Sequence, residues 1–349
     1  MRSPLLQLTA AFILCFFQSL AQEHVDSITL QYSTDKNTFQ LYESKHRGKI
    51  RTSNIELNYL NWGVPGNKAF IWLPGSFLSA YDFEPFASRL VQAGYFVISV
   101  DHYGHGQMQI PTKDLDFTDF AHDLNDLMDS LSIGSAVIGG FSRGAYLATA
   151  FYDKYPTKVQ KLVLEEGGTI PFKSLFDGLS SEQLNEFLSN VEPPTAIKDL
   201  LFSTYSTELE AFKNLVEFND GTSSFDYFSI IKGQGNKWVI YKDLDTYMHM
   251  QNGNQYHELL YSTNKVSKYA SAITRVNPIS VFARLNIPLL ILEANRGPFN
   301  KSKEIGNRAL KEQRPEWITY KQFDCDDHNI HFACPEEFLK ELLHFLNQN

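Results

Sequence analysis

The feature that most constrains the fold is a regular alternation of short apolar runs with amphipathic stretches from Gly48 onward. The apolar runs are bounded by turn-forming residues, as β-strands are. Strands that alternate with helices at this spacing form a mostly parallel sheet flanked by helices, so the predicted class is α/β. The expected strands are Lys49–Thr52, Ile55–Leu60, Ala69–Leu73, Tyr95–Val100, Ala136–Ile138, Lys161–Leu164, Pro288–Leu292 and Trp317–Phe323.

Residues 168–285 interrupt this alternation. They contain helix-like stretches, such as Ser181–Ser189 and Thr207–Val216, but few strand signals. We therefore expect a helical cap inserted after the sixth strand. The core domain would then comprise residues 48–167 and 286–349.

The first 21 residues have the pattern of a signal peptide. Arg2 precedes the apolar run Leu8–Phe17, and Ser19-Leu20-Ala21 resembles a small-x-small cleavage site. The run is about half of the roughly 20 residues that a membrane span requires, so the alternative of an uncleaved anchor is less favoured. We expect export, to a secreted or periplasmic location, and a mature chain that starts near Gln22. Residues 22–47 are polar and weakly patterned and are expected to form an N-terminal extension that wraps on the main domain.

The overall composition suits one large hydrophobic core and argues against one class of partner. Of the 349 residues, 43% are hydrophobic, and the formal net charge is −9. Nothing resembles a basic stripe, so a nucleic-acid partner is not expected. Two cysteines, Cys325 and Cys334, follow the leader and flank His328. In an oxidising compartment they could form a disulfide that clips the loop, or they could be two separate buried thiols.

The segment Gly140-Phe141-Ser142-Arg143-Gly144 follows an apolar run and precedes a helix-like stretch. This G-x-S-x-G spacing predicts a sharp strand-to-helix turn that exposes the serine hydroxyl at the edge of the sheet. Ser142 is therefore the candidate nucleophile, although a serine at this point could also be an ordinary helix N-cap.

A serine hydroxyl needs a base, and the base needs an orienting acid. His328 follows the last strand and precedes the closing helix from Pro335, so it is the candidate base. The pair His328 and His331 has no third metal ligand at plausible spacing, and no metal is expected. No cofactor is expected either, since the glycines at 139–140 lack the dinucleotide pattern G-x-G-x-x-G.

From about residue 48 to the C-terminus the chain resembles the α/β-hydrolase superfamily. The closing H-x-x-H-x-x-x-P pattern is similar to that of serine-hydrolase-like members. The resemblance implies that the backbone N–H groups of Ser76 and Arg143 form an oxyanion hole. It also implies that residues 101–106 form a structural turn beside the site. Four stretches carry the resemblance: Leu73-Pro74-Gly75-Ser76, Asp101-His102-Tyr103-Gly104-His105-Gly106, Gly140–Gly144, and His328 with Pro335.

The acid departs from the common pattern of the superfamily. Members usually carry an aspartate after the strand that is here Pro288–Leu292. This chain continues with Glu293-Ala294-Asn295-Arg296-Gly297, in which the position expected for that aspartate is not occupied by a carboxylate. Glu166, at the end of the preceding strand, corresponds to the glutamate of late-strand haloalkane dehalogenases. We therefore predict Glu166 as the acid, with Glu293 second and Asp326 third.

These residues predict an exported serine hydrolase that cleaves a carboxylic ester, thioester or lactone of a small acyl substrate. The same triad could instead hydrolyse a C–C or amide bond, because the fold does not fix the substrate. A third hypothesis, which the irregular acid position favours, is a ligand-binding homologue without turnover. The sequence carries no signal of oligomeric state.

Overall fold

The computed structural model describes residues 27–296, 299–325 and 328–348, which divide into two compact units. The larger unit comprises His46–Phe202 and Tyr241–Asn349, and the smaller comprises the chain up to Lys45 together with Ser203–Ile240. The predicted signal peptide at residues 1–21 lies outside the described residues. Within the part that is described, no helix is both long and apolar enough to cross a membrane.

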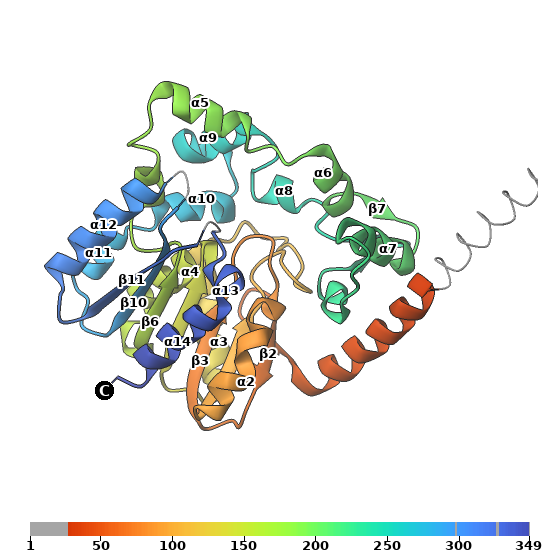
Figure 1. Cartoon of the computed structure of the whole chain (residues 1–349), viewed down its shortest axis with the longest axis horizontal. Coiled ribbons are helices and arrows are strands. Elements are labelled where there is room, and N and C mark those ends of the chain that lie inside the picture. Colours follow the sequence, from red (N-terminus) through yellow and green to blue (C-terminus); the bar gives the residue numbers. More distant parts are fainter. Residues whose placement is uncertain (1–26, 297–298, 326–327, 349) are drawn as a thin grey trace, which may run out of the picture. The chain divides into compact units, whose positions relative to one another are not determined.

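The larger unit is built on an eight-stranded sheet with the order β1-β2-β4-β3-β5-β6-β10-β11 (Figure 1). The first two strands pair antiparallel, β2 pairs antiparallel with β4, and all later neighbours are parallel. All eight predicted strands are present. They are β1 (Arg47–Arg51), β2 (Glu56–Trp62), β3 (Lys68–Leu73), β4 (Tyr95–Val100), β5 (Ala136–Phe141), β6 (Val159–Glu165), β10 (Leu289–Ala294) and β11 (Ile318–Phe323).

Helices cover both faces of this sheet, which explains the continuous apolar runs of its central strands. Every residue of β4, β5 and β10 is buried, as expected for strands with no solvent face. One layer joins α2 to α14 through Phe86 and Phe338, while α3, α4 and α11 pack together on the opposite face (Figure 1). The helices of this core are η1 (Ala80–Phe83), α2 (Glu84–Gln92), α3 (Phe117–Ser130), α4 (Arg143–Lys154), η2 (Pro156–Lys158), α11 (Pro278–Phe282), α12 (Asn300–Gln313), α13 (Ile330–Ala333) and α14 (Pro335–Leu346).

The predicted cap at residues 168–285 is helical, but it is not a single compact unit. Its middle part, Ser203–Ile240, groups with the N-terminal segment instead of with the rest of the insertion. The parts that belong to the larger unit contain η3 (Phe172–Leu175), α5 (Ser181–Ser189), α6 (Thr195–Leu201), α8 (Leu244–Tyr247), α9 (Gly253–Tyr261), η5 (Thr263–Lys265) and α10 (Lys268–Arg275).

The smaller unit combines an N-terminal helix with α7 (Glu208–Phe218), which the sequence predicted as the helix-like stretch Thr207–Val216, and with short strands that the sequence did not reveal. Residues 27–45 are helical, and the aromatic side chains of Tyr32 and Phe39 recur seven positions apart on one face. Tyr32 contacts Phe212 and Phe39 contacts Phe228, with ring centroids 5.6 and 5.7 Å apart. This stripe is sparse in an otherwise polar segment, which is why it was not recognised. The other elements are β7 (Thr204–Tyr205), η4 (Phe225–Ser229), β8 (Lys232–Gln234) and β9 (Lys237–Val239), whose strands form a small antiparallel sheet.

Candidate active site

Ser142 lies at the predicted sharp turn between β5 and α4. Its backbone has φ 51° and ψ −115°, a region that residues other than glycine rarely occupy. The flanking glycines are required by close approach. A Cβ on Gly144 would lie 1.9 Å from the carbonyl oxygen of Leu73, and a Cβ on Gly140 would lie 2.4 Å from the carbonyl of Gly144. The Ser142 side chain makes no capping bond to the helix, so its hydroxyl is available for other partners.

Three of the predicted site residues form a chain of hydrogen bonds. The Oγ of Ser142 lies 3.0 Å from Nε2 of His328, and Nδ1 of His328 lies 2.9 Å from Oε2 of Glu166. Glu166 has only acceptor oxygens when ionised, so Nδ1 carries the imidazole proton and Nε2 is left as the acceptor for the serine hydroxyl. The arrangement is that of a nucleophile, its base and the acid that orients the base.

Glu166 is held in place from three directions. It follows β6 directly and has φ 56°, so its side chain does not continue the alternation of side chains between the two faces of the strand. Its Oε1 accepts the backbone N–H of Ala294 at 2.6 Å, and its Oε2 accepts Nζ of Lys303 in addition to His328. The Glu166 side chain is 1% exposed. A carboxylate with this many donors is fixed in the orientation that faces the histidine.

The same contacts keep the Glu166 carboxylate ionised. Burial alone would raise its pKa, but the hydrogen bond from His328 and the positive charge of Lys303 outweigh burial and bring the pKa below its ordinary value. Lys303 belongs to α12 and was not predicted as part of the site. No sequence signal distinguishes it from the other lysines of that helix, because its role depends on how α12 packs beside β10.

The other two candidate acids differ from Glu166. Glu293 lies inside β10, where its Oε2 accepts Nδ2 of Asn307 at 2.6 Å and the hydroxyl of Tyr320 at 2.9 Å. Burial raises the pKa of its carboxyl. It has no hydrogen bond to His328 in the part of the chain that the structure describes. Asp326, the third candidate, lies outside the described residues.

A second histidine fixes the loop that carries His328. The ring of His331 is fully buried, with Nδ1 2.8 Å from the carboxylate of Glu165 and Nε2 3.0 Å from Oδ1 of Asp82. The backbone N–H of His331 also donates to Glu165, at 3.0 Å. Against the effect of burial, these two carboxylates raise the pKa of His331 to about 10, so the ring is an imidazolium at neutral pH. Because both ring nitrogens bind carboxylates, His331 is not available as a metal ligand.

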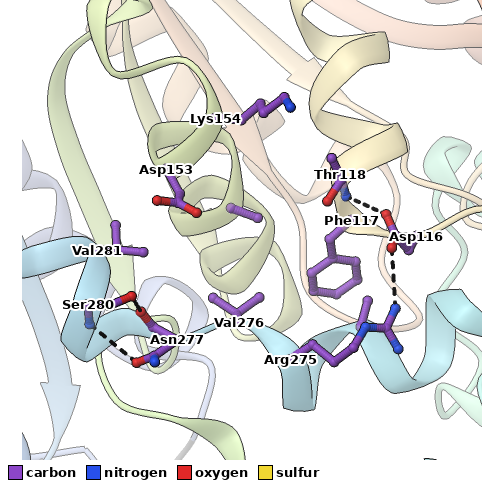
Figure 2. A pocket seen from close by; sticks show the side chains of 12 residues that line it. Asp116, Phe117, Thr118, Asp153, Lys154, Arg275, Val276, Asn277, Ser280 and Val281 are labelled. Carbon is purple, nitrogen blue, oxygen red and sulfur yellow. Dashed lines mark hydrogen bonds and ion pairs between the residues drawn. The ribbon is translucent and has the colours of Figure 1, made fainter.

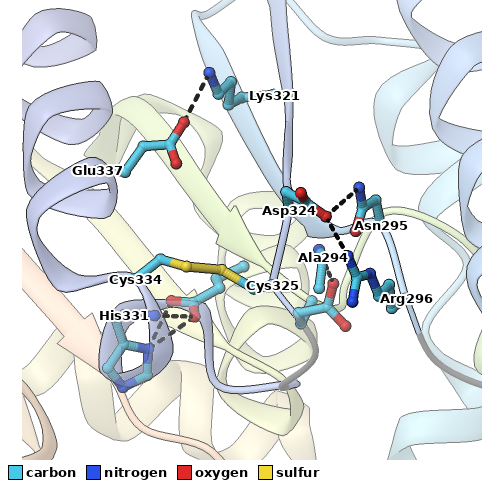
Figure 3. The surroundings of a disulfide bond; sticks show 11 residues. Ala294, Asn295, Arg296, Lys321, Asp324, Cys325, His331, Cys334 and Glu337 are labelled. Atoms are coloured by element: carbon cyan, nitrogen blue, oxygen red, sulfur yellow. Dashed lines mark hydrogen bonds and ion pairs between the residues drawn. A yellow bond between two sulfur atoms is a disulfide. The ribbon is translucent and has the colours of Figure 1, made fainter.

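A disulfide closes the same loop. The structure joins Cys325 to Cys334, and Figure 3 shows His331 beside this bridge. Of the two alternatives for the cysteines, the paired one is therefore observed. The bridge spans nine positions and encloses the loop between β11 and α14, so His328 is held at both ends.

The predicted oxyanion donors lie at the ends of two neighbouring strands. Ser76 follows β3, and Arg143 is the first residue of α4. The backbone N–H of each has no hydrogen-bond partner among the residues described. At a helix N-terminus such free N–H groups favour negative charge. Both groups are therefore available to a developing oxyanion beside Ser142.

A cavity of about 250 Å³ opens at this point. Ser142, His328, Ser76 and Arg143 line it, together with apolar side chains such as Phe172 and Leu259. A mainly apolar cavity with a few convergent polar groups is typical of a small-molecule site. Its volume suits a small substrate.

A second cavity, shown in Figure 2, lies between α3, α4 and α11 and has a volume of about 190 Å³. Several of its polar groups bind one another. Arg275 pairs with Asp116 at 3.4 Å, and Asn277 caps the backbone of Ser280. Because Ser280 has no histidine base among these lining residues, the cavity does not have the arrangement needed for nucleophilic catalysis.

Comparison with known proteins identifies the family of the chain. Residues 68–333 match the α/β hydrolase fold family, which is more than half of the chain. The chain therefore belongs to the α/β hydrolase fold family, as the sequence motifs indicated.

Individual relatives are distant. The chain is 35% identical over 125 residues to 2-hydroxy-6-oxononadienedioate/2-hydroxy-6-oxononatrienedioate hydrolase of Burkholderia vietnamiensis, covering 34% of this chain and 42% of that protein. It is 30% identical over 120 residues to human serine hydrolase BPHL, covering 33% and 41%. The crystal structure of a bacterial membrane phospholipase A is similar in fold, with a TM-score of 0.59, 17% identity and 98% coverage of both chains. The chain thus spans less than half the length of these two curated relatives.

Proposed function

We propose that this protein is a serine hydrolase that cleaves a carboxylic ester, thioester or lactone through an acyl-enzyme. The observation that carries the proposal is the pair of hydrogen bonds from Ser142 Oγ to His328 and from His328 to Glu166. These bonds meet in a cavity that Ser76 and Arg143 also line. Acyl transfer needs a nucleophile, a base, an acid and oxyanion donors, and the proposal assigns these roles to Ser142, His328, Glu166 and the backbone N–H groups of Ser76 and Arg143.

In the proposed mechanism, Nε2 of His328 takes the hydroxyl proton as Ser142 Oγ attacks the substrate carbonyl. The carboxylate of Glu166 stabilises the imidazolium that forms, and the N–H groups of Ser76 and Arg143 bind the oxyanion. His328 then returns the proton to the departing alcohol or thiol, which leaves an acyl group on Ser142. A water molecule, activated by His328, releases the acid and restores the serine.

A fluorophosphonate probe tests this proposal directly. The wild-type protein should be labelled on Ser142, and Ser142→Ala should lose both labelling and hydrolysis of a short p-nitrophenyl ester while keeping its thermal unfolding midpoint. Ser280→Ala, in the second cavity, is the matched control and should keep both. Full turnover by Ser142→Ala would show that another residue is the nucleophile.

C–C or amide hydrolysis by the same triad is the second candidate. It is favoured by the similarity to 2-hydroxy-6-oxononadienedioate/2-hydroxy-6-oxononatrienedioate hydrolase over 125 residues. Turnover of 2-hydroxy-6-oxononadienedioate, measured beside that of a simple ester, separates the two candidates. A protein that binds ligands without turnover would fail both assays and would resist the probe.

Export is the corresponding proposal for location. The leader at residues 1–21 and the Cys325–Cys334 bridge support it, since disulfides persist in oxidising compartments. The N-terminus of protein recovered from the medium or periplasm should lie near Gln22. Recovery of only the full-length chain from the cytoplasm would contradict export.

A further inference from the structure

Arg143 combines two features that the proposed mechanism does not use. Its guanidinium is buried, with the residue only 4% exposed, and it lines the cavity that contains Ser142. It also has no ion pair with a carboxylate among the residues that the structure describes. Buried cations in proteins are normally paired, because an uncompensated charge in a low-dielectric interior is strongly unfavourable.

The neighbours of the guanidinium accept hydrogen bonds from only some of its N–H donors. Nε donates to Oγ of Ser76 at 3.1 Å, and Nη1 lies 3.5 Å from the carbonyl oxygen of Tyr269. The rings of Phe117 and Tyr269 lie 5.8 and 5.7 Å from its central carbon, which permits cation–π contacts. Nη2 has no hydrogen-bond partner in the described part of the chain. The guanidinium of Arg143 therefore keeps N–H donors that could form a bidentate contact with a carboxylate.

Among the residues that the structure describes, no group packed against Arg143 supplies a negative charge at neutral pH. The nearby tyrosines, Tyr247, Tyr256 and Tyr269, have pKa values raised by burial and stay neutral. His102, which bridges Tyr269 and the carbonyl of Gly75, has its pKa lowered to about 3 by burial, with a smaller effect of the Arg143 charge. Burial also lowers the pKa of Arg143 itself, although an arginine stays charged. The positive charge at the cavity is thus not compensated by any carboxylate of the described residues.

We infer that the guanidinium of Arg143 binds a carboxylate of the substrate, so that the enzyme prefers esters that carry a second, ionised carboxyl group. This inference rests on the proposed function and names its substrate class. The carboxylate would lie beside the carbonyl under attack, because Arg143 follows the nucleophile directly and bonds Ser76, the other oxyanion residue. A cavity of about 250 Å³ fits a short chain between the two groups.

Two pairs of isosteric substrates test the preference. In the first pair, ethyl hydrogen glutarate and ethyl glutaramate differ only by a carboxylate or amide on the acyl group. In the second pair, 4-acetoxybutyrate and 4-acetoxybutyramide place the same difference on the leaving group. Each kcat/KM is divided by the rate of that ester with hydroxide. We expect the carboxylate member of one pair to be favoured about 10- to 100-fold, as for charge-assisted hydrogen bonds.

Variants then assign the preference to Arg143. Arg143→Gln should reduce the carboxylate-to-amide ratio to near unity, and Arg143→Lys should restore part of it. Ser76→Ala removes the Nε partner but keeps the charge, so the ratio should persist even if both rates fall. Arg275→Gln, which removes an arginine that is paired with Asp116, is the charge control and should leave the ratio unchanged.

The inference is overturned if the wild-type protein shows no carboxylate preference in either pair, an outcome that does not require any variant to fold. It is also overturned if Arg143→Gln lowers both members of the preferred pair equally, since the side chain would then act only on Ser76. If the protein hydrolyses no ester, the proposed function fails separately. Calorimetry of wild-type protein with glutarate and glutaramate then decides the binding question, and equal affinities would contradict a carboxylate site.

Discussion

Replacement of Glu166 by glutamine is the most informative perturbation of the proposed triad. One carboxylate oxygen accepts the backbone N–H of Ala294, and the other accepts His328 Nδ1 and Lys303. An amide has one acceptor and one donor. If its oxygen stays on Ala294, its NH₂ group faces Nδ1 and the ammonium of Lys303. The imidazole must then place its proton on Nε2, where it cannot accept the serine proton.

The expected cost follows from this change of tautomer. A misoriented base of this kind lowers turnover by ~10³ to 10⁴-fold, which corresponds to about 4 to 5.5 kcal/mol of transition-state stabilisation. The stability loss should be small, because glutamine keeps the shape of the side chain and Lys303, at 12% exposure, can turn toward solvent.

Glu293→Gln is the matched control. Glu293 is also a buried carboxyl next to the site, but its hydrogen bonds go to Asn307 and Tyr320, and the amide oxygen of glutamine can keep one of them. Its turnover should fall less than tenfold. Steady-state kinetics on a p-nitrophenyl ester, with circular dichroism to compare folding, gives both values. Activity of Glu166→Gln within tenfold of wild type, or a larger loss in Glu293→Gln, would refute this assignment of the acid.

Two further predictions concern the loop that carries His328. Replacing both Cys325 and Cys334 by serine should lower the free energy of unfolding by about 2.6 kcal/mol, the chain-entropy value for a bridge across nine positions. An unchanged midpoint of urea unfolding in the double serine variant would contradict this prediction. His331→Gln leaves the buried carboxylates of Glu165 and Asp82 without their cation and should cost about 3 to 5 kcal/mol. The raised pKa of His331 also sets a pH dependence, because its contribution is complete below its ordinary pKa of 6.5 and is lost as the pH rises through about 10. The free energy of unfolding of the wild-type protein should therefore fall as the pH rises from 6.5 to about 10, and that of His331→Gln should fall less. Parallel curves of stability against pH for the two proteins would disprove the ion network.

The sequence alone predicted all eight strands of the main sheet, because most of them are short apolar runs whose burial is a local property of the residues. It also predicted the turn at Ser142, where close packing requires glycine at two fixed positions. The position of His328 after the last strand followed from the order of elements. These features depend on local preference and on the fact that parallel strands end at one edge of a sheet.

Other features were beyond local reasoning. The division of residues 168–285, and the grouping of residues 27–45 with 203–240, depend on contacts between segments more than 150 positions apart. The sparse aromatic stripe of the N-terminal helix can be interpreted only once its partners, Phe212 and Phe228, are known. The same is true of Lys303, which reaches Glu166 across 137 positions.

The candidate acid best illustrates the difference between what the sequence predicts and what depends on tertiary contacts. The sequence by itself determined that Ser142 and His328, the candidate nucleophile and base, would meet at the carboxyl edge of an α/β sheet, and it offered three candidate carboxylates as the acid. Only the tertiary structure decided how these groups are used. Glu165, inside β6, binds His331, while Glu166 adopts a positive φ that directs it to His328. Neighbouring residues of a strand point to opposite faces, so the partner of each carboxylate depends on where the strand ends and on which loop packs against it.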